Sequence, residues 1–133
     1  MEERFIKRFE SFKKSLSALA EVRNRDINDD FVMSGAVQKF SLTFDIAWKV
    51  MKDMLLQFYG VSDFATGSPR ETLKKAVSCN LISEDLWIDM MSDRNLLAHD
   101  YDGSIAKEKI VVIVEQYLPM LEKFADCVDS KLN

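Results

Sequence analysis

Four polar residues near position 95 have types and a spacing suited to chemistry on a phosphate group. Arg94, Asn95, His99 and Tyr101 lie close together, and His99 is the only histidine in the sequence. On a helix, positions i and i+4 share a face, so Asn95 and His99 should project together. A guanidinium holds an oxyanion with two parallel hydrogen bonds, and histidine transfers protons near neutral pH. The pattern therefore indicates a site in which Arg94, Asn95 and His99 act on a phosphate.

The same residues also fit a structural interpretation. A histidine at the end of a helix often bonds to the last carbonyl groups of that helix. An arginine one turn earlier is often a surface cation. Taken alone, the spacing favours this interpretation, because clustered polar residues only raise the odds of a functional site.

Hydrophobic periodicity predicts the helices that must position these residues. Apolar residues recur every three or four positions over residues 2–22, and again from Asp29 or Asp30 to Tyr59, which predicts two amphipathic helices. The second is about 30 residues long and forms the expected spine of the fold. Ser68, Pro69 and Glu71 then have the spacing of an N-cap, a first-turn proline and a capping-box glutamate.

Two further helices should flank the polar segment. Residues 83–85 start one helix, which carries Arg94 and Asn95 and ends between His99 and Gly103. Ser104 can cap the last helix, which runs to about Ser130. Pro119 lies inside that pattern and should kink or split the helix, because proline lacks an N–H donor. We therefore predict an all-α, up-and-down four-helix bundle with one additional short helix, formed as a single domain by residues 1–133.

The composition excludes several classes of protein. No apolar run approaches the roughly 20 residues of a membrane span, and the charged start is not typical of a secretion signal. Cys79 and Cys127 lack metal-ligand spacing, so we expect reduced thiols, no metal site, no cofactor and a cytoplasmic location. The net charge of −4 argues against broad nonspecific binding of nucleic acid, although it permits a local basic patch. We interpret the cations Arg70, Lys74 and Lys75 as a solvated helix face.

Four segments carry a resemblance to a known family. Residues 94–99 match the Arg-x4-His motif of the HEPN superfamily, and Tyr101 completes its longer Arg-x4-His-x-Tyr form. Three neighbouring blocks agree with it: residues 40–49 (Phe-Ser-Leu-Thr-Phe-Asp-Ile-Ala-Trp-Lys), residues 68–71 (Ser-Pro-Arg-Glu) and residues 86–95 (Leu-Trp-Ile-Asp-Met-Met-Ser-Asp-Arg-Asn). Over nearly its whole length the chain resembles the HEPN group called nucleotidyltransferase substrate-binding proteins.

The resemblance implies a helical bundle, dimeric or larger, whose partner is a minimal nucleotidyltransferase encoded nearby. It implies two alternative functions. In the first, the bundle is the toxin of a toxin–antitoxin pair, a metal-independent endoribonuclease silenced when the partner adds AMP to the motif tyrosine, here Tyr101. In the second, the bundle is a non-catalytic substrate-binding or nucleotide-binding subunit of a two-component nucleotidyltransferase. The segment could also serve only as a dimer contact.

The nuclease alternative carries an expectation about assembly. Cleavage of RNA by its 2′-hydroxyl needs a base, an acid and cations near phosphorus, but one chain offers one histidine. A two-fold homodimer that juxtaposes the fourth helices would supply two copies of His99 and Arg94 in one groove.

Tyr101 is the expected acceptor of the nucleotide. It lies between Asp100 and Asp102 and just before Gly103, in a segment that should be an exposed turn. Its rivals are Tyr59, which is distant from the motif, and Tyr117, which falls on the apolar stripe of the last helix. The alternative is that the Tyr101 ring packs over the helix end.

Overall fold

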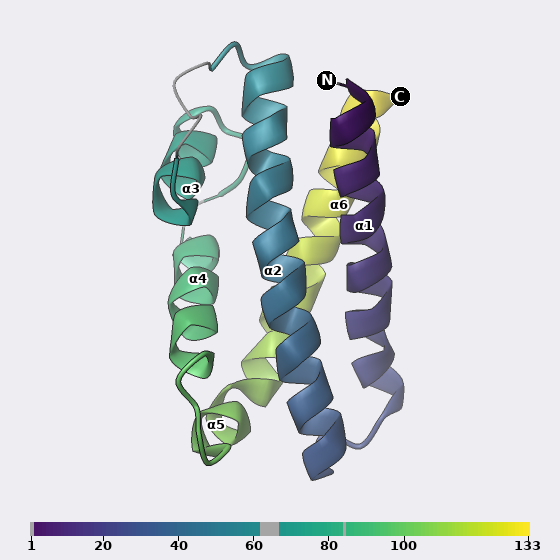
Figure 1. Ribbon diagram of the computed structural model, residues 1–133, viewed down its shortest axis with the longest axis vertical. Coiled ribbons are helices and arrows are strands. Elements are labelled where there is room, and N and C mark those ends of the chain that lie inside the picture. The colour runs from purple at the N-terminus through teal and green to yellow at the C-terminus, as the bar shows by residue number, and fades with distance from the viewer. Residues whose placement is uncertain (1, 62–66, 84) are drawn as a thin grey trace.

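Two long helices form the spine of the fold. The computed structural model describes residues 2–61, 67–83 and 85–133. Helix α1 (Glu2–Ala20) leads through a 3₁₀ turn, η1 (Glu21–Asn24), into α2 (Asp30–Phe58), which runs back alongside it (Figure 1). Asp29 caps α2 by accepting hydrogen bonds from the N–H groups of Phe31 and Val32, so the predicted start of this helix is confirmed.

The remaining helices lie around α2. Helices α3 (Pro69–Ser78) and α4 (Asp85–Leu97) follow one another along one side of it, and α5 (Ser104–Val112) crosses at the end where α4 stops (Figure 1). A π-helical turn, η2 (Ile113–Tyr117), then leads into α6 (Leu118–Leu132), which returns toward the chain's beginning. The described residues contain no strand. The predicted all-α bundle is confirmed, with α3 as the additional short helix.

Local signals explain where the helices begin and bend. Ser68 accepts a hydrogen bond from the Glu71 N–H and Pro69 opens α3, as predicted. The bend at Pro119 takes the form of η2, because the proline cannot donate to a carbonyl one turn earlier and the preceding turn widens. The predicted cap by Ser104 is wrong: Gly103 occupies the N-cap position with a φ of +80°, a conformation that favours glycine.

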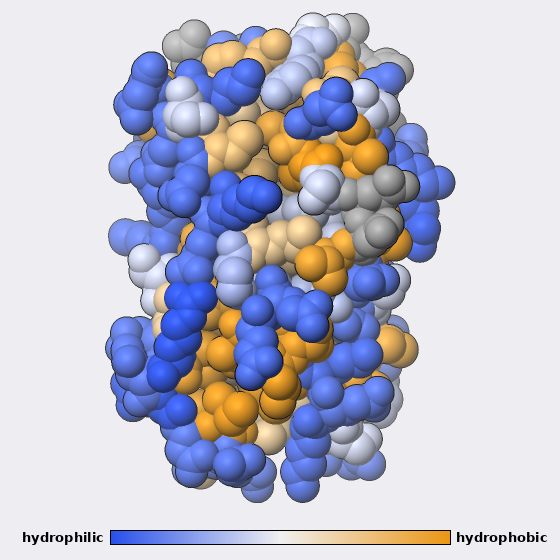
Figure 2. Space-filling model, turned by 180° about the vertical axis from the view of Figure 1, so that it is seen from behind, coloured by the Kyte–Doolittle hydropathy of each residue, from blue (hydrophilic) through white to orange (hydrophobic). Residues whose placement is uncertain are grey.

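A single apolar core joins the long helices. The stripe predicted on α1 is buried and packs against residues of α2 and α6. Trp48, in the middle of α2, is only half-buried. On the face opposite to that of Figure 1, hydrophobic side chains show between hydrophilic ones (Figure 2). The described part of the chain contains no helix with the length and apolar character that crossing a bilayer requires.

A buried polar cluster ties α4 to the bent helix. The Tyr117 hydroxyl donates to a carboxylate oxygen of Asp93, and the Lys109 Nζ lies 3.1 Å from the other oxygen. Both Tyr117 and Asp93 are buried, and the Tyr117 ring stacks on Phe40 with centroids 5.6 Å apart. Burial, followed by the hydrogen bond to Asp93, raises the pKa of Tyr117 well above its ordinary value. A buried carboxylate on α4 is thus satisfied by groups from η2 and α5.

Replacing Tyr117 with phenylalanine should destabilise the fold. The variant leaves a buried carboxylate without one of its donors, so we expect the free energy of unfolding to fall by about 1.5–3 kcal/mol. The parent should also lose stability above about pH 10, because unfolding releases a phenol that the folded state keeps protonated. Urea denaturation at pH 7 and pH 10.5 measures both effects.

Tyr59→Phe is the matched control for this prediction. The Tyr59 ring is half-buried under the Lys131 Nζ, 5.3 Å from its centroid, a contact that phenylalanine also makes. Its unfolding free energy should stay within about 0.5 kcal/mol of the parent. Equal stability of Tyr117→Phe and Tyr59→Phe would contradict the role assigned to the buried cluster.

Candidate functional site

The end of α4 carries the predicted motif. The Ala98 N–H still bonds to the Arg94 carbonyl one full turn back, whereas the His99 and Asp100 N–H groups bond to carbonyls only three residues back. This tightening ends the helix just after Leu97. The His99 side chain is exposed there.

Arg94 is held in place by Asp45, which lies 49 positions earlier on α2. The Arg94 Nε and Nη2 donate to the two carboxylate oxygens of Asp45, at 3.0 and 2.8 Å. These bonds raise the pKa of Arg94, so the guanidinium is a permanent cation. An arginine has five N–H donors, so three remain for another acceptor. Arg94 can therefore bind a phosphate from an orientation that Asp45 has already fixed.

An open cavity of about 660 Å³ surrounds this ion pair. Its wall comes from α2, the start of α3 and α4, and it combines cations, an indole and an amide. Arg70, which we predicted to lie on a merely solvated face, borders it, whereas Lys74 on the same helix does not. The lining residues are Phe44, Asp45, Trp48, Lys49, Ser68, Pro69, Arg70, Met91, Arg94 and Asn95.

Tyr101 lies in an exposed turn. Its side chain is 93% exposed, so the alternative in which the ring packs over the helix end is wrong. Asp100 fixes the turn, since its two oxygens accept the N–H groups of Ile105 and Ala106 at 3.1 and 2.8 Å. Asp102 accepts the Ser104 N–H, and this bond lowers the pKa of Asp102. The phenol is therefore displayed on a well-defined loop.

The four motif residues do not converge on one cavity within a single chain. Arg94 and Asn95 share the cavity beside Asp45, while Tyr101 borders a different cavity of about 430 Å³ with Leu97 and Lys107. Neither of these two cavities is lined by His99. The roles assigned to the motif residues stay predictions.

Sequence reasoning missed Asp45 and Asp93. An aspartate on a helix is normally exposed, and nothing local indicates a partner 49 or 24 positions away. The only available signal for Asp45 is its place inside the family-like block at residues 40–49. Within residues 2–61, 67–83 and 85–133, no three His, Cys, Asp or Glu side chains are grouped closely enough to hold a metal ion.

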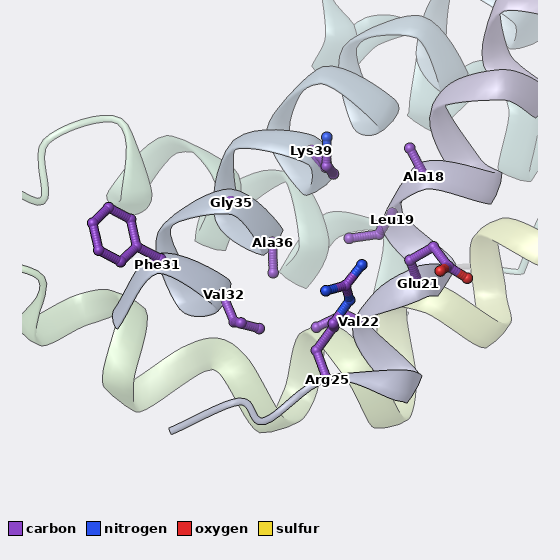
Figure 3. A pocket seen from close by; sticks show the side chains of 10 residues that line it. All are labelled: Ala18, Leu19, Glu21, Val22, Arg25, Phe31, Val32, Gly35, Ala36 and Lys39. Carbon is purple, nitrogen blue, oxygen red and sulfur yellow. The ribbon is translucent and has the colours of Figure 1, made fainter. Parts of the chain in front are cut away.

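Another cavity, of about 260 Å³, lies where α1 and η1 meet the start of α2. Its wall is mostly apolar, and Arg25 and Lys39 contribute its cations (Figure 3). The exposed Phe31 ring lies at one side of it, apart from the other lining side chains (Figure 3). This cavity lacks the combination of amide, indole and fixed guanidinium found beside Asp45. The cavity beside Asp45 is therefore the better candidate site.

Comparison with known proteins places the chain in context. A family model described as "Nucleotidyltransferase substrate binding protein like" matches residues 7–130. A relative named "Probable ribonuclease HepT", from Haemophilus influenzae, is 28% identical over 92 residues, covering 68% of this chain and 60% of the relative. The match thus spans less than two thirds of that relative's length.

Two solved structures share the fold. A HEPN toxin of Shewanella oneidensis, solved tri-AMPylated and in complex with an MNT antitoxin, has a TM-score of 0.75 at 18% identity, over 98% of this chain and 99% of that one. A protein of Thermus thermophilus has a TM-score of 0.70 at 23% identity, over 92% and 98% of the two chains.

Proposed function

This chain belongs to the nucleotidyltransferase substrate-binding protein-like family, and from that membership we propose that it is a HEPN-type toxin, a metal-independent endoribonuclease. A relative named as a probable ribonuclease and the fold shared with a HEPN toxin support the proposal. The observation that carries it is the arrangement at the end of α4, where an exposed His99 follows an arginine fixed by Asp45.

Each motif residue has a role in the proposed reaction. The RNA 2′-oxygen attacks phosphorus, the bond from phosphorus to the 5′-oxygen breaks, and a 2′,3′-cyclic phosphate forms. Arg94 binds the scissile phosphate and stabilises the charge that develops on it, while Asn95 orients the same group. A neutral His99 accepts the proton of the 2′-hydroxyl, and a protonated His99 supplies one to the leaving 5′-oxygen.

These two proton transfers require two histidines at once. The proposed enzyme is therefore a homodimer in which the ends of two α4 helices meet across a two-fold axis. The exposure of His99 at the helix end is compatible with such a groove. One His99 then acts as the base and its mate as the acid.

The proposed partner is a minimal nucleotidyltransferase that adds AMP to Tyr101. The Tyr101 phenol is 93% exposed on a turn, so it can enter another enzyme's active site, where carboxylates and Mg²⁺ can activate it. The added phosphate would lie two residues from His99. It would compete with an RNA phosphate for Arg94 and repel it, which silences the nuclease.

The second candidate function, a non-catalytic nucleotide-binding subunit, is supported by the cavity beside Asp45. A volume of about 660 Å³ and a wall with an indole, an amide and cations suit a nucleotide. Here the same residues would bind a substrate for the partner without cleaving it. A parent protein that binds nucleotides but neither cleaves RNA nor inhibits growth would favour this function.

Removing either proposed catalytic side chain should abolish cleavage. We expect His99→Ala and Arg94→Ala each to lower the rate of RNA cleavage by at least about 100-fold, because each removes proton transfer or charge stabilisation. Cleavage of a fluorescently quenched oligoribonucleotide in EDTA measures the rate. Mixing the two variants should not restore it, since a mixed dimer holds only one His99 and the proposed reaction uses two.

Lys14→Gln, an exposed change on α1, is the control and should cleave like the parent. Cleavage that survives both His99→Ala and Arg94→Ala would overturn the nuclease proposal. If both variants cleave RNA without EDTA and the parent cleaves none in EDTA, the cleavage comes from a metal-dependent contaminant.

Tyr101→Phe should block modification by the partner. Incubation with the neighbouring nucleotidyltransferase, ATP and Mg²⁺ should add AMP to the parent, and peptide mass mapping should place it on Tyr101. The phenylalanine variant lacks the acceptor oxygen and should gain no AMP, whereas Tyr59→Phe should be modified like the parent. Undiminished incorporation into Tyr101→Phe would show that another residue is the acceptor.

A further inference from the structure

We propose that a groove on both sides of Trp48 binds the single-stranded RNA next to the scissile phosphate, with one base stacked on the indole. This inference rests on the proposed nuclease function and extends it to a substrate-binding surface outside the motif. It assigns Trp48, Lys49 and Arg70 to recognition of the RNA strand.

Two cavities meet at Trp48. The cavity that contains Arg94 and a second one, of about 350 Å³ between α1 and α2, are both lined by Trp48 and Lys49. The second cavity continues along α2 to Lys52 and across to Arg4 and Arg8 on α1. A strand bound at Arg94 that crosses Trp48 would therefore enter the second cavity along α2.

The path is basic although the protein is acidic. Six basic and two acidic side chains line the two cavities, in a chain whose net charge is −4. Both carboxylates are already paired with arginine: Asp45 with Arg94, and Asp53 with Arg8, whose Nη1 lies 2.8 Å from both of its oxygens. The other basic side chains along the path are Arg4, Lys49, Lys52 and Arg70. The surplus of positive charge therefore lies where the RNA backbone would pass.

Trp48 supplies an aromatic surface on which a base can stack, next to the basic side chains. It is half-buried, so one part of the indole is anchored among apolar side chains while another borders both cavities. The Lys49 Nζ lies over the indole, 5.9 Å from its ring centroid, and a stacking base would displace this exposed lysine toward the RNA backbone. Proteins that bind single strands combine a basic groove with aromatic stacking platforms, and stacking tolerates any sequence.

Fluorescence can report this contact directly. The chain has two tryptophans, and Trp87 is buried in the core with an exposed fraction of 2%, so quenching by a base should come from Trp48. We would titrate a mixed-sequence 12-nucleotide single-stranded RNA into the non-cleaving His99→Ala protein. Tryptophan emission and the anisotropy of a 5′-fluorescein label would be recorded across a salt series.

The expected results separate stacking from charge. Adding Trp48→Leu to the His99→Ala protein should lower its affinity for the RNA about 5- to 100-fold and remove the quenching of tryptophan emission. Trp48→Phe keeps an aromatic surface and should retain most of the affinity. Lys49→Gln and Arg70→Gln should each lower the slope of log affinity against log salt by about 0.7, whereas Lys14→Gln, outside both cavities, should not change it.

Unchanged affinity and salt slope in Trp48→Leu, Lys49→Gln and Arg70→Gln would overturn the inference. The inference would also be overturned if these variants lost affinity only for the nucleotidyltransferase and not for RNA, because the groove would then be a protein contact. If Trp48→Leu fails to fold by circular dichroism, the exposed Lys49 and Arg70 decide the outcome. If the parent binds RNA as described but does not cleave it, the nuclease proposal is refuted and the RNA-binding groove is retained. If the parent cleaves RNA but the groove variants bind it like the parent, the groove is refuted and the nuclease proposal is retained.

Discussion

The end of α4 is fixed from two directions by neighbouring residues. Asp93 accepts the Tyr117 hydroxyl and pairs with Lys109, which ties the helix to η2 and α5. Arg94, about 100° further round the helix, donates two hydrogen bonds to Asp45 on α2. The last turn of a short helix would otherwise fray. The motif is presented in one orientation because these two contacts hold the turn that carries it.

The pair between Asp45 and Arg94 has a cost as well as a benefit for the proposed activity. It occupies two of the five guanidinium donors and places a negative charge beside the expected phosphate. It is partly exposed, so it contributes little to stability. Its benefit is that the guanidinium need not be ordered when a phosphate binds. The cations bordering the same groove, Arg70 and Lys49, offset the carboxylate's repulsion.

The predictable part of this protein is its local chemistry. Asp29, Ser68 and Pro69 each act within one helical turn, so their signals were sufficient to place helix starts. Pro119 correctly predicted a break but not its form, since a missing N–H donor can be accommodated by a kink, by a split or by a widened turn. The prediction for Ser104 was wrong because the carboxylate of Asp100, four positions earlier, accepts the first N–H groups of the helix in its place. The Asp45 contact lay beyond prediction, because it needs α2 and α4 already packed together.

The chemistry of the product ends tests the central proposal most directly. Attack by the 2′-hydroxyl, assisted by protein side chains and not by a metal, leaves a 2′,3′-cyclic phosphate on one fragment and a 5′-hydroxyl on the other. We would digest a defined oligoribonucleotide in excess EDTA and identify both ends by mass spectrometry. The account predicts cyclic phosphate and 5′-hydroxyl ends at an undiminished rate. Fragments with 3′-hydroxyl and 5′-phosphate ends, formed only when a divalent metal is restored, would contradict it.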